Sequence, residues 1–262
     1  MPKTALWFYI GDTHVLSDTG LAIDGYEIGS KEKKPYVCGD SQKWLMSAWR
    51  DAVEFIELAS LDYRVGIGFG GDIKDGTQHH GSTQTHGTPE DQRQMSFELL
   101  KPLVSVATWA YGILGTEAHT GPQGDDDRAI YTMLGIDYYD KLEAQIEGHT
   151  VLHAHHGVPV GTRDHTIESG AISLLKDIQA RRKDEGKPHP SAIIGHDRHR
   201  SFRPLNMRDT WIAVCPCWQL PTYYGNNWPF SDVSIGFLMW DVQHNKLERV
   251  TYRQESHVKR FI

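Results

Sequence analysis

Residues 5–14 of the sequence read A-L-W-F-Y-I-G-D-T-H. The apolar and aromatic run from Ala5 to Ile10 has the length and composition of a buried strand. It stops at Gly11, and Asp12 and His14 follow directly. The stretch therefore predicts a core strand that delivers a carboxylate and an imidazole at its carboxyl end.

The same pattern of an apolar run followed by Asp, Glu or His recurs four more times along the chain. The later clusters are 71–75 (G-D-I-K-D), 115–119 (G-T-E-A-H), 153–156 (H-A-H-H) and 195–199 (G-H-D-R-H). Ligands of open α/β sheets bind beyond the carboxyl ends of the strands. Clusters that are far apart in the sequence can therefore meet at one site.

The residue types in these clusters indicate a metal centre. Mixed histidine and carboxylate ligation suits Mn, Fe or Zn better than Mg or Ca, which prefer oxygen ligands alone. Two ions roughly 3.5–4 Å apart need about seven or eight ligands with one shared carboxylate, and the five clusters supply that number. The sequence predicts two divalent metal ions, with Mn first and Fe or Zn as alternatives.

Strand and helix patterns alternate before residue 200, and strands accumulate afterwards. Strands are expected at 5–10, 64–69, 108–114, 150–154 and 190–194, and helices at about 44–56 after a Ser41 cap, 89–104, 126–134 and 169–182. Residues 76–88 are expected to form a polar loop. The segments 211–218, 234–242 and 247–253 are expected to be antiparallel strands, the last two joined by a turn. This order predicts one α/β domain over 1–262, whose sheet is extended or packed on a second sheet.

Composition narrows the protein class and the partners. The chain has 262 residues, of which 39% are apolar and 23% charged, as in a soluble globular protein. No apolar run is long enough to span a membrane, and the N-terminus lacks a signal-peptide pattern. Three cysteines point to a reducing compartment, so a cytoplasmic location is expected. The net charge of −7 favours small phosphorylated substrates over long duplex DNA.

The order of the five clusters resembles the calcineurin-like metallophosphoesterase superfamily, whose pattern is D-x-H, G-D-x-x-D, G-N-H-D/E, a lone His and G-H-x-H. The resemblance covers about residues 5 to 200. It implies a two-sheet αββα sandwich of mixed strands with flanking helices. It also implies hydrolysis of a phosphoester by attack of a hydroxide that bridges two metal ions.

The resemblance also implies roles for individual residues. Asp12 and His14 resemble ligands of the first metal, and Asp72 resembles the carboxylate that bridges the two ions. Asp75 is expected to orient a ligand. His196 resembles a ligand of the second metal. His155 is expected to join it, with His156 as the alternative.

Two clusters depart from the family pattern. In 115–119, Thr116 or Glu117 stands in place of the amide ligand, and Glu117 is the better metal ligand because it carries a carboxylate. His119 then takes the place of the general acid that protonates the leaving group. The final cluster is one residue longer than G-H-x-H, so His199 needs a bulge or turn to reach the first metal. Asp197 is the alternative.

Three arginines lie within a few residues of the ligand candidates: Arg198, Arg200 and Arg163. Arg198 and Arg200 are predicted to bind the substrate phosphate. The predicted reaction is phosphodiester rather than monoester hydrolysis, because an acidic histidine helps most with a poor alkoxide leaving group.

The expected substrate is a small phosphoester or a single-stranded nucleic acid. A nuclease acting on DNA or RNA is the alternative enzyme, and a non-catalytic metal-binding scaffold is the alternative of another class. An aromatic segment contains Trp218, Tyr223, Tyr224 and Trp228. These side chains could stack on bases, but the simpler expectation is that they cover the apolar core.

Other polar residues have simpler interpretations. His153 and His156 are expected to be hydrogen-bonded rather than metal-bound, and His79, His80 and His86 to be solvated. Cys215 and Cys217 are expected to share one face of a strand in the core. The G-T-E-A-H cluster and the stretch 217–221 (C-W-Q-L-P) resemble metallophosphoesterases encoded by bacteriophages.

Overall fold

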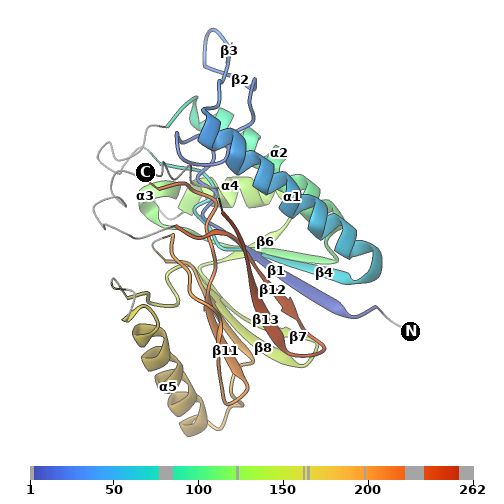
Figure 1. Cartoon of the computed structure of the whole chain (residues 1–262), viewed down its shortest axis with the longest axis vertical. Helices are drawn as coiled ribbons and strands as arrows, with labels where there is room; N and C mark the ends of the chain where they lie inside the picture. The colour runs from blue at the N-terminus through green and yellow to red at the C-terminus, as the bar shows by residue number, and fades with distance from the viewer. Residues whose placement is uncertain are drawn as a thin grey trace, which may run out of the picture.

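The structure is a computed structural model that describes residues 3–76, 85–121, 124–161, 163, 166–197, 199–221 and 233–253. Two mixed sheets lie face to face between layers of helices (Figure 1). The predicted fold class, a two-sheet αββα sandwich with flanking helices, is confirmed. No helix in these described ranges is both long enough and apolar enough to cross a membrane.

The first sheet carries the N-terminal strand at its centre. Its strand order is β13-β12-β1-β4-β5-β6. The bounds are β1 (Ala5–Ile10), β4 (Arg64–Phe69), β5 (Trp109–Ile113), β6 (Asp137–Tyr139), β12 (Ile235–Asp241) and β13 (Lys246–Tyr252). Strands β1, β4, β5 and β6 run parallel, whereas β12 pairs antiparallel with β1 and with β13. The carboxyl ends of the parallel strands therefore share one edge.

The second sheet has the order β10-β11-β9-β8-β7. Its strands are β7 (Lys141–Ile146), β8 (His149–Ala154), β9 (Ala192–Gly195), β10 (Leu205–Met207) and β11 (Thr210–Val214). Strands β8, β9 and β11 are parallel to one another. The short strands β2 (Glu27–Ile28) and β3 (Lys34–Pro35) form a separate hairpin.

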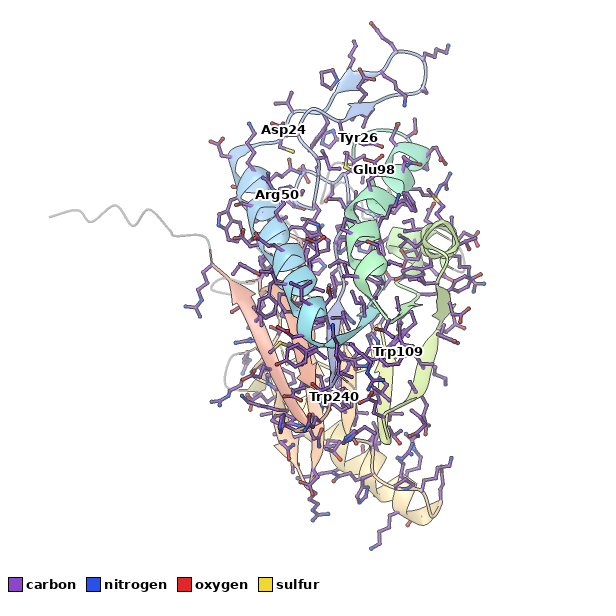
Figure 2. All side chains as sticks on the ribbon, turned by 90° about the vertical axis from the view of Figure 1, so that its right-hand side faces the viewer. Asp24, Tyr26, Arg50, Glu98, Trp109 and Trp240 are labelled. Carbon is purple, nitrogen blue, oxygen red and sulfur yellow. The ribbon has the colours of Figure 1, made fainter. Side chains whose placement is uncertain are left out.

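Helices cover the outer faces of the two sheets. Helices α1 (Asp40–Asp62), α2 (Pro89–Val106) and α4 (Asp125–Leu134) pack on the first sheet, and α5 (Ser169–Asp184) packs on the second. The four-residue helix α3 (Glu117–Thr120) follows β5. Figure 2 shows α1 and α2 side by side over the first sheet, with Arg50 of α1 and Glu98 of α2 labelled.

Three apolar cores correspond to the three boundaries between layers. Leu45, Trp49 and Leu100 belong to the core beneath the helices of the first sheet. Trp7 and Trp240 belong to the core between the sheets. Because a central strand alternates its side chains between the two faces of the sheet, β1 contributes to both cores and is buried throughout.

Several local predictions need correction. Helix α1 begins at Asp40 with Gly39 as its N-cap, so Ser41 lies inside the helix and is not the cap. The predicted strand 211–218 ends at Val214 and pairs parallel with β9 in the second sheet. Cys215 and Cys217 are both buried but lie in different cores, because the chain leaves the strand before them.

Candidate metal centre

The loops that follow β1 and β4 are joined by backbone hydrogen bonds. The Asp12 N–H donates to Gly71 O at 3.0 Å, and the His14 N–H donates to Asp72 O at 3.1 Å. This pairing brings the first two clusters of the sequence together. The His196 N–H donates to His155 O, which links the loops after β8 and β9 in the same way.

Four candidate ligands have left-handed backbone conformations. The φ angles are 50° at Asp12, 43° at His14, 49° at Asp72 and 53° at His199. Such conformations cost of the order of 1–3 kcal/mol each and persist where the surrounding structure enforces them, often at functional sites. At His199 the turn is also the bend that the longer final cluster needs to reach the site.

Among the residues that the structure describes, histidine and carboxylate side chains converge into three groups that could each hold a metal ion. The groups are Asp12, His14 and His199; His14, Asp72 and His119; and Asp12, Asp72 and His155. The ligand atoms of each group lie within 4.8 Å of one another. The groups overlap through Asp12, His14 and Asp72, so the site is one continuous cluster.

Distances within the cluster are short. His14 Nε2 lies 3.0 Å from His199 Nε2. His155 Nε2 lies 3.1 Å from Asp72 Oδ2 and 3.8 Å from Asp12 Oδ1. The other nitrogen of His155 donates to Gly70 O, which leaves Nε2 for the carboxylates. Of the alternatives His155 and His156, the structure therefore brings His155 to the cluster.

His196 lies beside this cluster and is fully buried. Its Nδ1 is 3.9 Å from Asp12 Oδ2. The imidazole ring occupies the space where a Cβ on Gly11 or Gly70 would lie. The glycines before the two aspartates therefore make room for a histidine from the last cluster.

His119 and Asp75 form a hydrogen-bonded pair beside the cluster. His119 Nδ1 donates to Asp75 Oδ1 at 2.6 Å, and the rings of His119 and His14 are 4.5 Å apart between centroids. Asp75 is fully buried. Its carboxylate therefore orients His119 at the edge of the cluster.

Thr116 contacts a candidate ligand rather than joining a metal group. Its N–H donates to Asp72 Oδ1 at 2.6 Å, and its hydroxyl lies 3.1 Å from the same oxygen. Glu117 is exposed and, among the described residues, belongs to none of the three groups. It lines a pocket of about 410 Å³ together with Arg128 and Asp140. The ligand role of Glu117 stays a prediction.

None of the three groups contains Arg200, Arg163, Asp197 or His156. The Arg200 guanidinium donates to Gly161 O at 3.3 Å, and Arg163 is exposed. The Asp197 carboxylate accepts the Val160 N–H at 3.1 Å, and His156 is largely exposed beside it. Arg198, His79, His80, Tyr223, Tyr224 and Trp228 lie outside the described residues.

Sequence reasoning missed Asp127, which joins two of the ligand-bearing loops. Its carboxylate accepts N–H groups from Asp72 at 3.1 Å, Ile73 at 3.2 Å and Gly115 at 2.9 Å. Burial and the neighbouring Asp72 charge raise the pKa of Asp127 to about 7, although these donors favour the carboxylate. The sequence signal was three consecutive aspartates where α4 begins, which helix-terminus electrostatics also explain.

The pKa shifts of the buried carboxylates and histidines indicate whether a cation fits the cluster. Burial raises the pKa of Asp12 to about 6, and the Asp72 charge adds to this rise. Burial alone would raise the pKa of Asp72 as well, but the charge and hydrogen bond of His155 hold it below its usual range. Despite its burial, His155 has a pKa raised to about 10 by Asp72 and Asp12. Without a metal, a protonated imidazole therefore supplies the positive charge between two buried carboxylates.

Unpartnered nitrogens support the same conclusion. Nδ1 of His196 is buried without a hydrogen-bond partner within the described structure, and Nδ1 of His14 faces Asp75 Oδ1 at 3.6 Å, beyond hydrogen-bond distance. Burial lowers the pKa of His196 and of His199 well below the usual value, so both rings are neutral. Neutral imidazoles and ionised carboxylates are the donor set that binds Mn, Fe or Zn. The residues present fit a divalent cation.

No family model matches the sequence. No curated protein matches it either. Among solved structures, an archaeal phosphodiesterase is 10% identical over 94% of this chain and 99% of its own, with a TM-score of 0.47. Vps29 of Chaetomium thermophilum is 12% identical over 93% of this chain and 83% of its own, with a TM-score of 0.46. Nothing in these comparisons supports the expected likeness to bacteriophage proteins.

Proposed function

We propose that the chain is a metal-dependent phosphoesterase that prefers phosphodiesters. The observation that carries this proposal is the convergence of Asp12, His14, Asp72, His155 and His199 from four different loops into one buried cluster. Burying several carboxylates in one cluster is costly unless positive charge compensates them, and a divalent cation bound there would supply it. The order of these residues in the sequence, which resembles that of the metallophosphoesterases, supports the same function.

In this proposal two ions share the cluster. Asp12, His14 and His199 would hold the first, while Asp72, His155 and His196 would hold the second. Asp72 would contact both ions, because it lies within ligand distance of residues from each set. Divalent ions bound there would polarise the phosphoryl oxygens and lower the pKa of an attacking water.

The remaining residues of the centre act on the substrate or on the ligands. His119 donates its Nδ1–H to Asp75, so when the ring is protonated on both nitrogens its Nε2–H can pass a proton to the leaving oxygen and the neutral ring remains bonded to Asp75. Thr116 donates two hydrogen bonds to Asp72 and fixes the orientation of its carboxylate. Such contacts to ligands typically change metal affinity about 10- to 100-fold.

The first experiment measures metal content and hydrolysis of bis(p-nitrophenyl) phosphate with Mn²⁺. Asp72→Asn should lose bound metal and turnover together, because an amide replaces the central carboxylate. Asp62→Asn is the matched control, since Asp62 is exposed at the end of α1. A wild-type protein that binds no divalent ion and hydrolyses nothing would contradict the proposal and favour the scaffold.

Two further variants separate the roles of neighbouring residues. His119→Ala should lower kcat by about 10²- to 10⁴-fold while the metal stays bound, as expected of a general acid. Loss of metal instead would make His119 a ligand. Glu117→Ala tests the sequence-based prediction for Glu117: a loss of metal supports a ligand role, whereas unchanged metal content assigns the carboxylate to the pocket.

Substrate choice needs a direct comparison. Labelled single-stranded DNA and RNA should be compared with cyclic and linear nucleotide diesters under the same metal conditions. Faster hydrolysis of the small diesters is expected from the acidic net charge of −7. Faster cleavage of the polymers would favour the nuclease.

A further inference from the structure

A buried chain of three polar side chains crosses the apolar core between the two sheets. Tyr111 Oη lies 2.9 Å from His153 Nδ1, and His153 Nε2 lies 3.0 Å from His196 Nε2. Tyr111 belongs to β5 of the first sheet, His153 to β8 of the second, and His196 follows β9. Their exposed fractions are 6%, 1% and 0%. The three groups therefore depend on one another for hydrogen bonds.

The end of this chain faces the metal centre. His196 uses Nε2 to contact His153, while its Nδ1 lies toward Asp12 Oδ2 at 3.9 Å. That distance is too long for a hydrogen bond, and Nδ1 is buried without a partner in the described structure. The ring cannot turn freely, because it fills the space beside Gly11 and Gly70. Nδ1 is therefore the atom that His196 can offer to a cation.

The position of one proton decides whether Nδ1 can bind. An imidazole that binds a cation through one ring nitrogen carries its N–H on the other nitrogen, and the other nitrogen of His196 lies 3.0 Å from His153 Nε2. An imidazole nitrogen binds a metal only through its lone pair. His196 must then carry its proton on Nε2 and donate it to His153 Nε2. His153 in turn must carry its proton on Nδ1 and donate it to the Tyr111 oxygen.

The opposite order of donors would block the site. If Tyr111 donates to His153 Nδ1, then His153 donates from Nε2 and His196 holds its proton on Nδ1. That N–H would be buried without an acceptor, since Asp12 is 3.9 Å away. An unsatisfied buried donor costs about 1–3 kcal/mol. The first order has the same cost at the Tyr111 O–H, whose hydrogen-bond partner among the described residues is His153 Nδ1. The two orders differ at the cation, because the Nδ1–H of His196 in the second order repels it and the Nδ1 lone pair in the first order can bind it.

We propose that Tyr111 and His153 are positioning residues for His196, and that they hold it in the tautomer whose Nδ1 lone pair faces the cation. The inference rests on the metal centre of the proposed function. In this arrangement His153 Nε2 accepts the proton of His196, and Tyr111 accepts that of His153. Contacts of this kind from outside the ligand set fix the ring and tautomer of a metal-bound histidine.

Substitutions at His153 and Tyr111 separate hydrogen bonding from packing. His153→Phe keeps a ring of similar size but accepts no proton, so Zn²⁺ affinity should fall about 10- to 100-fold. His153→Gln offers a carbonyl oxygen to His196 Nε2 and should restore most of that affinity. Tyr111→Phe removes the acceptor for His153 and should weaken Zn²⁺ binding in the same direction.

Matched controls come from hydrogen bonds elsewhere. His149 lies on the same strand as His153 and bonds Ser191 Oγ at 2.9 Å, so His149→Phe removes a comparable contact. Tyr36 is buried and bonds the Gln42 side chain at 2.9 Å, which makes Tyr36→Phe the control for Tyr111→Phe. Both controls should bind Zn²⁺ with wild-type affinity.

A second measurement does not depend on variants. Histidine ¹⁵N chemical shifts of the wild-type protein report which nitrogen of His196 carries the proton. The metal-free protein should show the proton on Nε2, and the Zn²⁺-loaded protein should show Nδ1 as the bound atom. A proton on Nδ1 without metal, or binding through Nε2, would overturn the inference.

The outcomes for the two proposals are distinguishable. Wild-type Zn²⁺ affinity in a folded His153→Phe variant overturns the positioning role and leaves the proposed phosphoesterase intact. A wild-type protein that binds no divalent ion removes the metal centre and the positioning role together. Metal binding without phosphoester hydrolysis removes only the enzyme, and the tautomer measurement then still decides the role of His153.

Discussion

Gly70 leaves the space that the imidazole ring of His196 fills. A Cβ on Gly70 would lie 1.9 Å from His196 Nε2, a distance that no packing tolerates. Gly70→Ala should therefore displace His196 and destabilise the fold by about 1–3 kcal/mol, as overpacked cores do. Metal affinity should fall as well, since His196 can no longer reach Asp12. Denaturant unfolding and metal titration measure the two effects.

The control for this glycine is Gly39, where an added Cβ would meet nothing within 4 Å. Gly39→Ala should leave metal affinity close to wild type, and any loss in the free energy of unfolding there reflects only the poorer N-cap of α1. Equal behaviour of the two alanine variants would mean that His196 does not depend on the space beside Gly70.

Backbone conformation explains which residues of the site could be predicted from sequence. Asp12, His14 and Asp72 directly follow strands, so the apolar runs before them reveal their position at the sheet edge. Glu117 also follows a strand, but the short helix α3 begins at this residue and the side chain lines a neighbouring pocket. Its placement depends on the course of the loop, which the residue pattern does not reveal. The partnership of His153 with Tyr111 joins different strands and sheets, so no local pattern shows it.

Asp127 connects helix α4 to the loops that follow two strands of the first sheet. It lies in the first turn of α4, yet its carboxylate receives N–H groups from the loops after β4 and β5. Asp127→Asn keeps the size but replaces one acceptor oxygen with an amide donor. At least one buried N–H then loses its partner, and we expect a destabilisation of about 1–3 kcal/mol. Urea unfolding of the metal-free protein measures it.

Asp125 provides the comparison within the same helix turn. It is exposed, so Asp125→Asn removes only a favourable interaction with the helix dipole and should cost less than about 1 kcal/mol. If Asp127→Asn costs no more than Asp125→Asn, the loops after β4 and β5 do not depend on this carboxylate.

Helix α2 has a complete capping box at its N-terminus. The Thr88 hydroxyl accepts the Asp91 N–H at 3.1 Å, and the Asp91 carboxylate accepts the Thr88 N–H at 2.8 Å. Thr88→Ala should lower the free energy of unfolding by about 0.5–2 kcal/mol, because one helix N–H loses its acceptor. Thr132→Ala is the control, since that exposed hydroxyl only donates to the Arg128 carbonyl of its own helix. Equal unfolding energies of the two variants would exclude a stabilising cap.

Sequence patterns predicted the buried elements better than the edge strands. Strands β1 and β4 are buried along almost their whole length, so their apolar runs are unbroken. Strand β7 lies at the edge of the second sheet and reads K-L-E-A-Q-I, with alternate residues exposed. Because half of its residues are polar, the sequence of β7 resembles that of a loop. Strand β6 is too short to give a pattern. The edge strand β13, by contrast, was predicted at 247–253 and is confirmed at Lys246–Tyr252.

The cluster of candidate ligands lies where the loops of the two sheets meet. Asp12 and Asp72 are each 3% exposed, so folding removes both carboxylates from water. Positive charge must compensate them, and in the metal-free protein His155 supplies it. A divalent ion that binds the folded chain therefore stabilises the fold as well as creating the proposed catalytic site.

The thermal midpoint of unfolding should report this coupling. A ligand that binds only the folded state at 100 times its Kd stabilises by about 2.7 kcal/mol. Each kcal/mol raises the midpoint of a protein of this size by about 2–4 °C, so Mn²⁺ should raise it by about 5–10 °C over the chelator-treated protein. Calorimetry of wild type and Asp72→Asn with Mn²⁺ or EDTA measures the difference. The Asp72→Asn variant should show little Mn²⁺ dependence, because it lacks the central carboxylate. A wild-type midpoint that is the same in Mn²⁺ and in EDTA would mean that the cluster balances its charge with protons alone.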